Sequence, residues 1–484
     1  MAASPDRRWL ALALISAVQF MVVLDIAIVN VALPSIKVDL GFSQENLQWV
    51  ISAYALAFGG FLLLGGRAAD LLGRRRVFVA GLVLFAAGSI VAGLAWSEAS
   101  LIGARSLQGL GAAVISPAAL SILMTTFREG RERNIALGVW GAVGMFGAAA
   151  GVLLGGIFTD LLSWEWIFYI NVPVALAALA LTPVLLAESR DARGQGFDAL
   201  GAVLVTAGLS TSVFAITKAN DYGWTSARTI GLFAVAATLL GAFVAVERRR
   251  TDPLMSFSIF KIKTVTGANV AGFILGTALF SMFLMLTLYM QQVLGYSALK
   301  SGFAYLAVAG TSIFWATLAS QLVTKIGVKT VLVTGMSLLT VGMLYFTQVS
   351  VGGSYVRDLL PGFLIVAVGM SFAFVAVSIA ALAGIEAKDA GLASGMINTS
   401  QQIGGALGIA ILSSVAVAQT GSAARAGDSV PVALTTGFHA AFWVGTAIAA
   451  LGVLASAVLI RKEELVTAPA SEADGQVEEL ALAA

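Results

Sequence analysis

Long stretches of apolar residues follow one another along almost the whole chain. A helix needs about 20 such residues to cross a hydrocarbon core of about 30 Å. The first stretch is longer than the core of a signal peptide, so we interpret it as a membrane helix rather than a cleaved leader. The pattern predicts an all-α polytopic membrane protein with fourteen spans, at about residues 9–33, 46–66, 76–96, 100–125, 134–158, 166–187, 197–217, 228–247, 265–292, 301–323, 328–350, 357–383, 391–417 and 435–460.

Composition supports this interpretation. Hydrophobic residues make up 59% of the 484-residue chain and charged residues 11%, against about 45–50% and about 25% in soluble domains. The net charge of +2 gives no reason to expect nucleic acid as a partner. The chain has no cysteine, which excludes disulfides, thiolate metal sites and cysteine nucleophiles.

The basic residues predict the orientation. Of the 28 lysines and arginines, 21 fall in loops on one side of the predicted membrane, six fall on the other, and Arg105 lies inside a helix. Cytoplasmic loops carry the excess of positive charge in membrane proteins. We therefore expect a multi-pass protein of the inner (plasma) membrane with both termini in the cytoplasm.

A weak internal repeat predicts the domain organisation. The loop from Gly66 to Arg76 is similar to the loop from Ser320 to Lys329, with Gly73 aligned to Gly327 and basic residues after each. Parallel repeats of this kind occur in one class of secondary transporters, whose site lies near the midplane between the halves. The predicted units are a six-helix bundle at 1–190, a two-helix insertion with its flanking loops at 191–263, a second six-helix bundle at 264–460 and a disordered tail at 461–484.

Asp25 and Arg105 are charged residues that lie inside predicted spans, away from the span ends. Asp25 sits in the middle of the first, where a carboxylate costs about 2.5–3.5 kcal/mol on insertion scales. At about 1.5 Å per residue, Asp25 lies roughly 24 Å above the cytoplasmic end of its helix, and Arg105 roughly 7 Å below the outer end of the fourth. These depths coincide. We predict that Arg105 holds Asp25 ionised until substrate or a conformational change releases it to take up a proton; a static ion pair is the alternative.

Other polar and flexible side chains could line a substrate cavity. Asn398, Gln401 and Gln402 recur at helical spacing, and they either face an aqueous cavity or form hydrogen bonds between helices. The methionines of the ninth span could form an adaptable apolar wall, or they could be ordinary packing residues. The predicted cavity residues are Asn30, Gln108, Met282, Met285, Gln291, Gln292, Asn398, Gln401 and Gln402.

These motifs resemble those of the fourteen-helix drug:proton antiporter family of the major facilitator superfamily, along nearly the whole chain to about residue 460. The run from Leu24 to Ile36 is similar to the family's first-helix motif. Arg105 with Gln108, Gly109 and Gly111 is similar to the fourth-helix motif, for which the resemblance implies a role in proton transfer. The resemblance also implies a cytoplasmic gate formed by the loop residues Gly66, Asp70, Gly73, Arg74 and Arg75.

The fifth span resembles the family's antiporter motif. Its small-residue face, which lets helices approach closely, consists of Gly147, Gly151, Gly155 and Gly156. Val152 stands where the family motif has proline. Proline would remove a backbone donor and favour a kink, so this chain lacks the residue that usually makes the hinge.

Several function classes do not fit the sequence. A primary pump would need a phosphate-binding loop, and an enzyme would need a nucleophile with a base, or a metal cluster; the chain has neither pattern. We expect a secondary active transporter without cofactors that exports small amphipathic molecules by proton antiport through alternating access. Its partners would be substrate, protons and membrane lipids, and it would act as a monomer. A symporter or facilitator for uptake of a small metabolite is the alternative.

Overall fold

The computed structural model describes residues 5–127, 131–189, 198–250, 262–381 and 390–461, and in these ranges the chain is helical, with no β-strand. The α-helices, in chain order, are α1 (Pro5–Leu40), α2 (Trp49–Leu72), α3 (Arg74–Gly93), α4 (Glu98–Thr126), α5 (Arg131–Leu161), α6 (Trp166–Tyr169), α7 (Asn171–Leu185), α8 (Ala199–Tyr222), α9 (Ala227–Arg249), α10 (Lys263–Leu288), α11 (Ala298–Ile326), α12 (Val328–Phe346), α13 (Leu360–Ala381), α14 (Ala390–Arg425) and α15 (Val430–Leu459). Two π-helical turns, η2 (Tyr289–Val293) and η3 (Tyr355–Leu359), extend α10 and precede α13.

The helices have the length and composition of membrane spans. Within the described ranges, 12 helical segments are long and apolar enough to cross a bilayer, and α6 with α7 forms one of them, Trp166–Leu185. Two shorter apolar segments, Trp49–Leu62 and Ala150–Leu161, lie in α2 and α5. The structure thus has an all-helical, multi-span architecture. The number fourteen stays a prediction, because length and composition alone identify 12.

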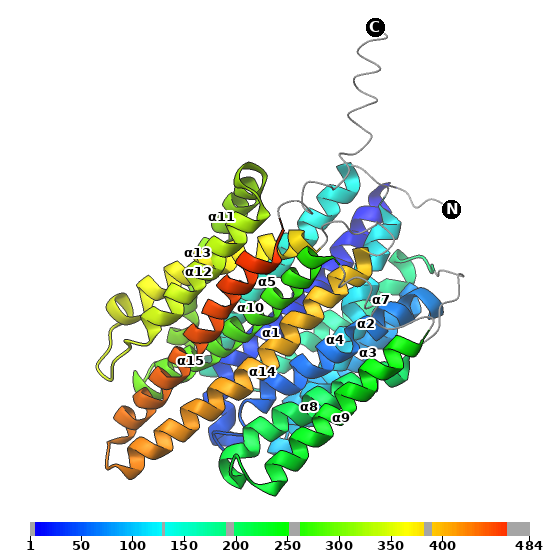
Figure 1. The fold of residues 1–484 in the computed structure, drawn as a ribbon. Coiled ribbons are helices and arrows are strands. Elements are labelled where there is room, and N and C mark those ends of the chain that lie inside the picture. The colour runs from blue at the N-terminus through cyan, green and yellow to red at the C-terminus, as the bar shows by residue number, and fades with distance from the viewer. Residues whose placement is uncertain (1–4, 128–130, 190–197, 251–261, 382–389, 462–484) are drawn as a thin grey trace.

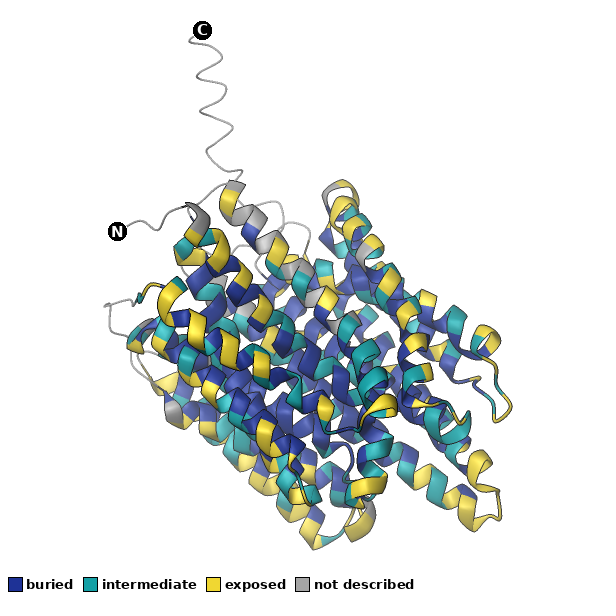
Figure 2. Ribbon diagram, turned by 180° about the vertical axis from the view of Figure 1, so that it is seen from behind, coloured by how far each residue is buried: buried dark blue, intermediate teal, exposed yellow. Residues whose placement is uncertain are grey.

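The helices before and after α8 and α9 form two groups (Figure 1). In the first group, α1 packs on α5, and α4 packs between α2 and α3. In the second group, α10 packs on α14 and α15, and α13 packs on α11 and α12. Buried side chains fill the interior, and exposed ones cover the outside (Figure 2). The domain boundaries predicted from the repeat stay predictions.

The two repeated loops have the same local geometry. Gly73 is the single residue between α2 and α3, with φ +107°, and Gly327 is the single residue between α11 and α12, with φ +88°. Glycine adopts this region without the steric cost that a Cβ imposes. Each glycine therefore allows two long helices to follow one another with no further linker.

The two groups meet along two pairs of helices, α5 with α11 and α2 with α14. α1 begins and α15 ends on the same side of the molecule (Figure 1). We call this side the terminal face and the opposite side the far face. The α2–α3 loop lies at the terminal face, and the α5–α6 and α14–α15 connections lie at the far face.

The hairpin of α8 and α9 lies at one edge of the molecule (Figure 1), and α8 contacts both groups through α2 and α14. Gln48, just before α2, donates to the Thr217 hydroxyl at 2.8 Å, and Ser414 of α14 donates to the Ile216 carbonyl at 3.1 Å. The inserted hairpin therefore bridges the interface between the groups rather than extending one of them.

Candidate functional site

The carboxylate of Asp25 is fully buried in the first group, with 0% of the residue exposed. Its Oδ2 accepts a hydrogen bond from Arg105 Nη1 at 2.6 Å. Its Oδ1 accepts one from Gln108 Nε2 at 3.0 Å and one from Asn171 Nδ2 at 2.8 Å. Asp25 and Arg105, which the sequence places at the same depth, are thus in direct contact. Gln108 of α4 and Asn171 of α7 add two amide donors.

Hydrogen bonds and an aromatic ring hold the side chain of Arg105 in place. Its Nε donates to the Val50 carbonyl at 2.9 Å, and its Nη1 also donates to Gln108 Oε1 at 2.9 Å. The guanidinium carbon lies 4.4 Å from the centre of the Tyr54 ring, a distance at which cation–π attraction contributes. Gln108 also donates to the Ser89 hydroxyl at 2.8 Å. Side chains or carbonyls from α1, α2, α3, α4 and α7 therefore share one polar cluster.

The local sequence of α4 sets the direction of these side chains. Ser97 caps the helix by accepting from the Ser100 backbone, and the Ser100 hydroxyl accepts in return from the Ser97 backbone. This reciprocal cap fixes where the helix begins. Arg105 and Gln108, three residues apart, then lie on one face of the helix.

Two glycines let the neighbouring helices come close enough. A methyl group added at Gly109 would lie 2.4 Å from the Tyr54 carbonyl oxygen, and one added at Gly88 would lie 2.8 Å from the Gln108 backbone nitrogen. A residue with a Cβ atom would therefore clash at either position. The small residues thus allow α2, α3 and α4 to enclose the ion pair at backbone distance.

A buried ion pair of this kind depends on the charges of both partners. Removing one partner of a buried pair costs about 3–5 kcal/mol, because it leaves an uncompensated charge. A proton on Asp25 removes a charge in the same place without removing a side chain. Two oxygens of the cluster, Asn171 Oδ1 and the Tyr54 hydroxyl, are buried and have no hydrogen-bond partner in the described part of the chain.

The predicted gate loop contacts its own helix group. Arg75 donates to Glu188 Oε1 through its backbone nitrogen at 3.1 Å, and its Nη1 donates to the Leu186 carbonyl at 3.3 Å. The Arg74 backbone nitrogen donates to the Ser189 carbonyl at 2.9 Å. Gly73 is buried and Gly66 is half buried. The side chain of Asp70 lies outside the described residues, so its predicted role stays a prediction.

The four glycines of α5 contact two different partners. Gly147, Gly151 and Gly155 pack on α1: methyl groups added at Gly151 and Gly155 would lie 2.8 Å and 2.6 Å from the carbonyl oxygens of Leu24 and Ile28. Gly156 instead packs on α11. The glycine face therefore fixes α1 on both sides of Asp25. α5 continues as one helix through Val152.

Polar contacts also join the two groups at the far face. The carboxylate of Asp160, near the end of α5, accepts from the backbone nitrogens of Ala298 at 3.1 Å and Leu299 at 3.0 Å, the first residues of α11. Gln291 donates from η2 to the Val31 carbonyl of α1 at 2.8 Å. The first group thus supplies a carboxylate to the positive end of a helix in the second.

The predicted cavity residues do not form one surface. Gln108 belongs to the ion-pair cluster, and Asn30 donates to the Ile26 and Ala27 carbonyls of its own helix. Gln401 and Gln402 are buried, whereas Asn398 is exposed. A methyl group added at Gly59 of α2 would lie 3.0 Å from Gln402 Cβ, so Gln402 lies at the α2–α14 contact.

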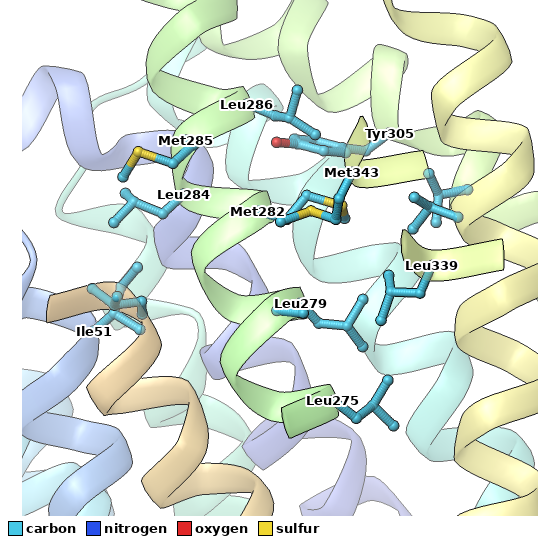
Figure 3. Close-up of a cluster of buried hydrophobic side chains, with 14 of the residues drawn as sticks. Ile51, Leu275, Leu279, Met282, Leu284, Met285, Leu286, Tyr305, Leu339 and Met343 are labelled. Atoms are coloured by element: carbon cyan, nitrogen blue, oxygen red, sulfur yellow. The ribbon is translucent and has the colours of Figure 1, made fainter. Parts of the chain in front are cut away.

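The methionines of α10 are packing residues in this structure. Met282 and Met285 are 0% and 1% exposed and belong to one apolar cluster with Leu339 and Met343 of α12 (Figure 3). Their predicted place in a substrate cavity stays a prediction. Gln292 is half buried in η2.

Several residues of these contacts are not evident from the sequence. Nothing in the sequence pattern assigns a role to Asn171, Tyr54 or Ser89. Asp160 and Glu188 lie near helix ends, where acids are common, so no sequence signal distinguishes them. A polar side chain within an apolar span, as at Asn171, is the one available signal.

The comparisons with known proteins agree with this architecture. The sequence profile described as Major Facilitator Superfamily matches residues 15–409. The puromycin resistance protein pur8 of Streptomyces alboniger is 38% identical over 459 residues, which cover 94% of this chain and 91% of that protein. The cephamycin export protein CmcT of Amycolatopsis lactamdurans is 37% identical and covers 92% and 90%.

Solved structures share the fold. A crystal structure of peptide transporter POT in complex with sulfate has a TM-score of 0.67 at 16% identity, covering 93% of this chain and 94% of that one. A structure of nucleoside transporter NupG has a TM-score of 0.66 at 13% identity, covering 93% and 99%. The matched superfamily consists of transporters, so the chain is not an enzyme. The sequence profile and the relatives show that this chain is a multi-pass membrane transporter belonging to the Major Facilitator Superfamily.

Proposed function

We propose that this transporter exports small amphipathic, antibiotic-like molecules in exchange for protons, and that Asp25 carries the proton. The observation that carries the proposal is the fully buried Asp25–Arg105 pair with a 2.6 Å contact. Ionisable residues inside membrane spans mark proton relays and ion or substrate pathways.

Protonation would release α1 from α4. A neutral Asp25 loses its Coulomb attraction to Arg105, while Arg105 keeps the Val50 carbonyl, Gln108 Oε1 and the Tyr54 ring as partners. The positive charge of Arg105 is therefore still stabilised by neighbouring groups of the protein. This asymmetry supports Asp25, rather than Arg105, as the group that changes state.

The release can reach the interface between the helix groups through α1 and α5. The glycines on α5 hold α1 next to Asp25, and the same helix carries Gly156 and Asp160 against the start of α11. A shift of α1 therefore either moves α5 with it or separates α1 from α5. Either movement changes the contact that joins the groups at the far face, as alternating access requires.

The names of the relatives support export over the uptake alternative. One relative is a puromycin resistance protein, one is a cephamycin export protein, and another is a lincomycin resistance protein from Streptomyces lincolnensis that is 35% identical. Resistance conferred by a carrier requires removal of the compound from the cell. Small antibiotics of this kind are therefore the substrates to test first.

The rest of the proposal concerns the membrane. We propose fourteen spans in the inner (plasma) membrane, arranged as six, two and six, with the terminal face in the cytoplasm. Transport needs no cofactor and no nucleic acid, uses the proton gradient, and is carried out by a monomer. The predicted excess of basic residues in loops on one side supports this orientation.

The test is transport into inverted membrane vesicles energised with a proton gradient, with ethidium and puromycin as probes. Wild-type vesicles should accumulate at least one probe, and Asp25→Asn vesicles should not. Asp39→Asn is the matched control, because Asp39 lies on the same helix, is exposed, and accepts from Trp164 Nε1 at 2.9 Å. Equal gradient-driven accumulation in wild type and Asp25→Asn would contradict the proposal.

A further inference from the structure

A cavity of about 530 Å³ lies between α2, α4 and α8, separate from the ion-pair cluster. Its α4 wall is a stripe that includes Gly103, Ser106 and Leu110. Arg105 and Gln108 are on the other face of the same helix, where they bind Asp25. The cavity therefore lies behind the helix that presents the ion pair, and α8 of the inserted hairpin forms one of its walls.

Two contacts between α2 and α8 bound this cavity along its length. At one end, Gln48 donates to the Thr217 hydroxyl at 2.8 Å. At the other end, Gly60 lies so close to Thr206 that an added methyl group would come within 2.0 Å of the Thr206 hydroxyl oxygen. The 11 residues from Thr206 to Thr217 correspond to about 16 Å along the helix. The residues of α2 that line the cavity run from Trp49 to Phe61, about 18 Å along that helix.

The walls are mostly apolar, with hydroxyl groups from Ser106, Thr206 and Ser210. Trp49, Ala53 and Phe61 contribute from α2, and no charged side chain is among the described residues that line the cavity. The Ser106 hydroxyl donates to the Ile102 carbonyl of its own helix at 3.0 Å, so it offers no free donor. Burying a polar solute against such walls without hydrogen bonds is costly. A hydrocarbon fits them.

The cavity opens to the outside of the molecule. Gly103 is exposed, and Ser106, Leu110, Thr206 and Ser210 are half buried rather than sealed. The neighbouring helix of the hairpin, α9, exposes apolar side chains such as Ile230 and Val235. In a bilayer this opening therefore faces lipid chains.

We propose that this cavity binds one acyl chain of a membrane phospholipid, and that the chain fills the space under the inserted hairpin. The bound chain contacts α2, α4 and α8 together. It would stabilise the packing of α8 on the two helices that hold Arg105. This inference assigns a ligand to the hairpin and does not depend on the proposed direction of transport or on proton coupling.

Gly103 allows the cavity to be filled without a clash. A Cβ added there meets no atom within 4 Å, so Gly103→Leu places a side chain at the cavity. Gly241→Leu is the matched control, because a Cβ at Gly241 on α9 also meets no atom within 4 Å and this residue does not line the cavity. Ser210→Phe fills the same space from the α8 wall.

The test uses the full chain in vesicles of phosphatidylethanolamine and phosphatidylglycerol that contain a phospholipid with a photoreactive diazirine in one acyl chain. After illumination, mass spectrometry of the digested protein should find adducts on Ser106, Thr206 or Ser210 in wild type and Gly241→Leu. Gly103→Leu should lose the adducts on the α8 wall. Added phospholipid should also raise the unfolding temperature in detergent for wild type and Gly241→Leu more than for Gly103→Leu.

Two results would overturn the proposal. One is labelling of the cavity residues that neither Gly103→Leu nor Ser210→Phe reduces. The other is labelling no stronger at the cavity than at exposed positions of α9 such as Ile230, which would mean annular lipid only. Unfolding temperatures in lipid-free detergent show that each variant is folded before its adducts are compared.

Discussion

The two helix groups bury their polar side chains in different ways. In the first group, the buried cluster contains a full charge pair, Asp25 and Arg105. In the second, Tyr305 donates to the Phe283 carbonyl at 2.8 Å, shares a hydrogen bond with Thr287 at 2.9 Å, and packs on Phe363 with ring centres 5.3 Å apart. One cluster is ionic and the other is neutral, although the repeated loops show that the groups are built alike.

The difference indicates a division of labour. Protonation of Asp25 changes the charge of the first cluster. The second cluster consists of hydrogen bonds between neutral groups and has no such charge to change. Met282 and Met343 of the second group belong to a buried apolar cluster that also includes residues of the first group (Figure 3). We infer that proton coupling resides in the first group and that the second supplies a packed body against which it moves.

The largest expected effect comes from breaking the ionic cluster on one side only. Arg105→Met should lower the stability of the protein by about 3–5 kcal/mol, because Asp25 is left charged or must be neutralised in a buried site. The double variant Asp25→Leu with Arg105→Met should recover most of that stability and still not couple transport to protons. Thermal unfolding in detergent measures the first effect, and vesicle transport the second. A double variant as unstable as the single one would contradict this account of the pair.

A smaller effect is expected from the apolar core of the second group. Met282→Ala should cost about 2 kcal/mol or more through the cavity it leaves. Transport per folded molecule, and its dependence on the proton gradient, should stay as in wild type. The measurement pairs unfolding temperature with initial transport rates normalised to folded protein. Lost proton coupling in folded Met282→Ala would show that the second group takes part in coupling.

The smallest effect should come from removing one neutral donor of the ionic cluster. Asn171→Leu takes away the hydrogen bond to Asp25 Oδ1 but leaves Arg105 and Gln108 in place. A hydrogen bond to a charged group contributes about 1.5–3 kcal/mol, so the charged carboxylate loses part of its stabilisation relative to the neutral acid. The pH dependence of transport should move upward while the maximal rate changes less. An unchanged pH profile would mean that Asn171 is only a packing residue.

Much of the ionic cluster is predictable from the sequence, for a simple reason. Depth along a membrane helix follows from residue number, so residue numbers suffice to match Asp25 with Arg105. Gln108 follows Arg105 by three residues and shares its face. The aligned glycines at Gly73 and Gly327 likewise predict two similar helix connections, which the structure contains.

Other parts depend on packing between distant helices. Asn171 reaches Asp25 because α7 packs beside α1, and Asp160 reaches the start of α11 from another helix group. Helical spacing cannot decide between a cavity and a core for Met282, since both place the residue away from solvent. The span count also depends on structure, because α6 and α7 together form one span.

The most direct test of the central claim is proton release on substrate binding. Purified protein in weakly buffered detergent solution, with a pH-sensitive dye, should release protons when a transported compound such as puromycin is added. Asp25→Asn should bind the compound without releasing protons, and Asp39→Asn should behave like wild type. Equal proton release from wild type and Asp25→Asn would contradict the claim that Asp25 exchanges its proton for substrate.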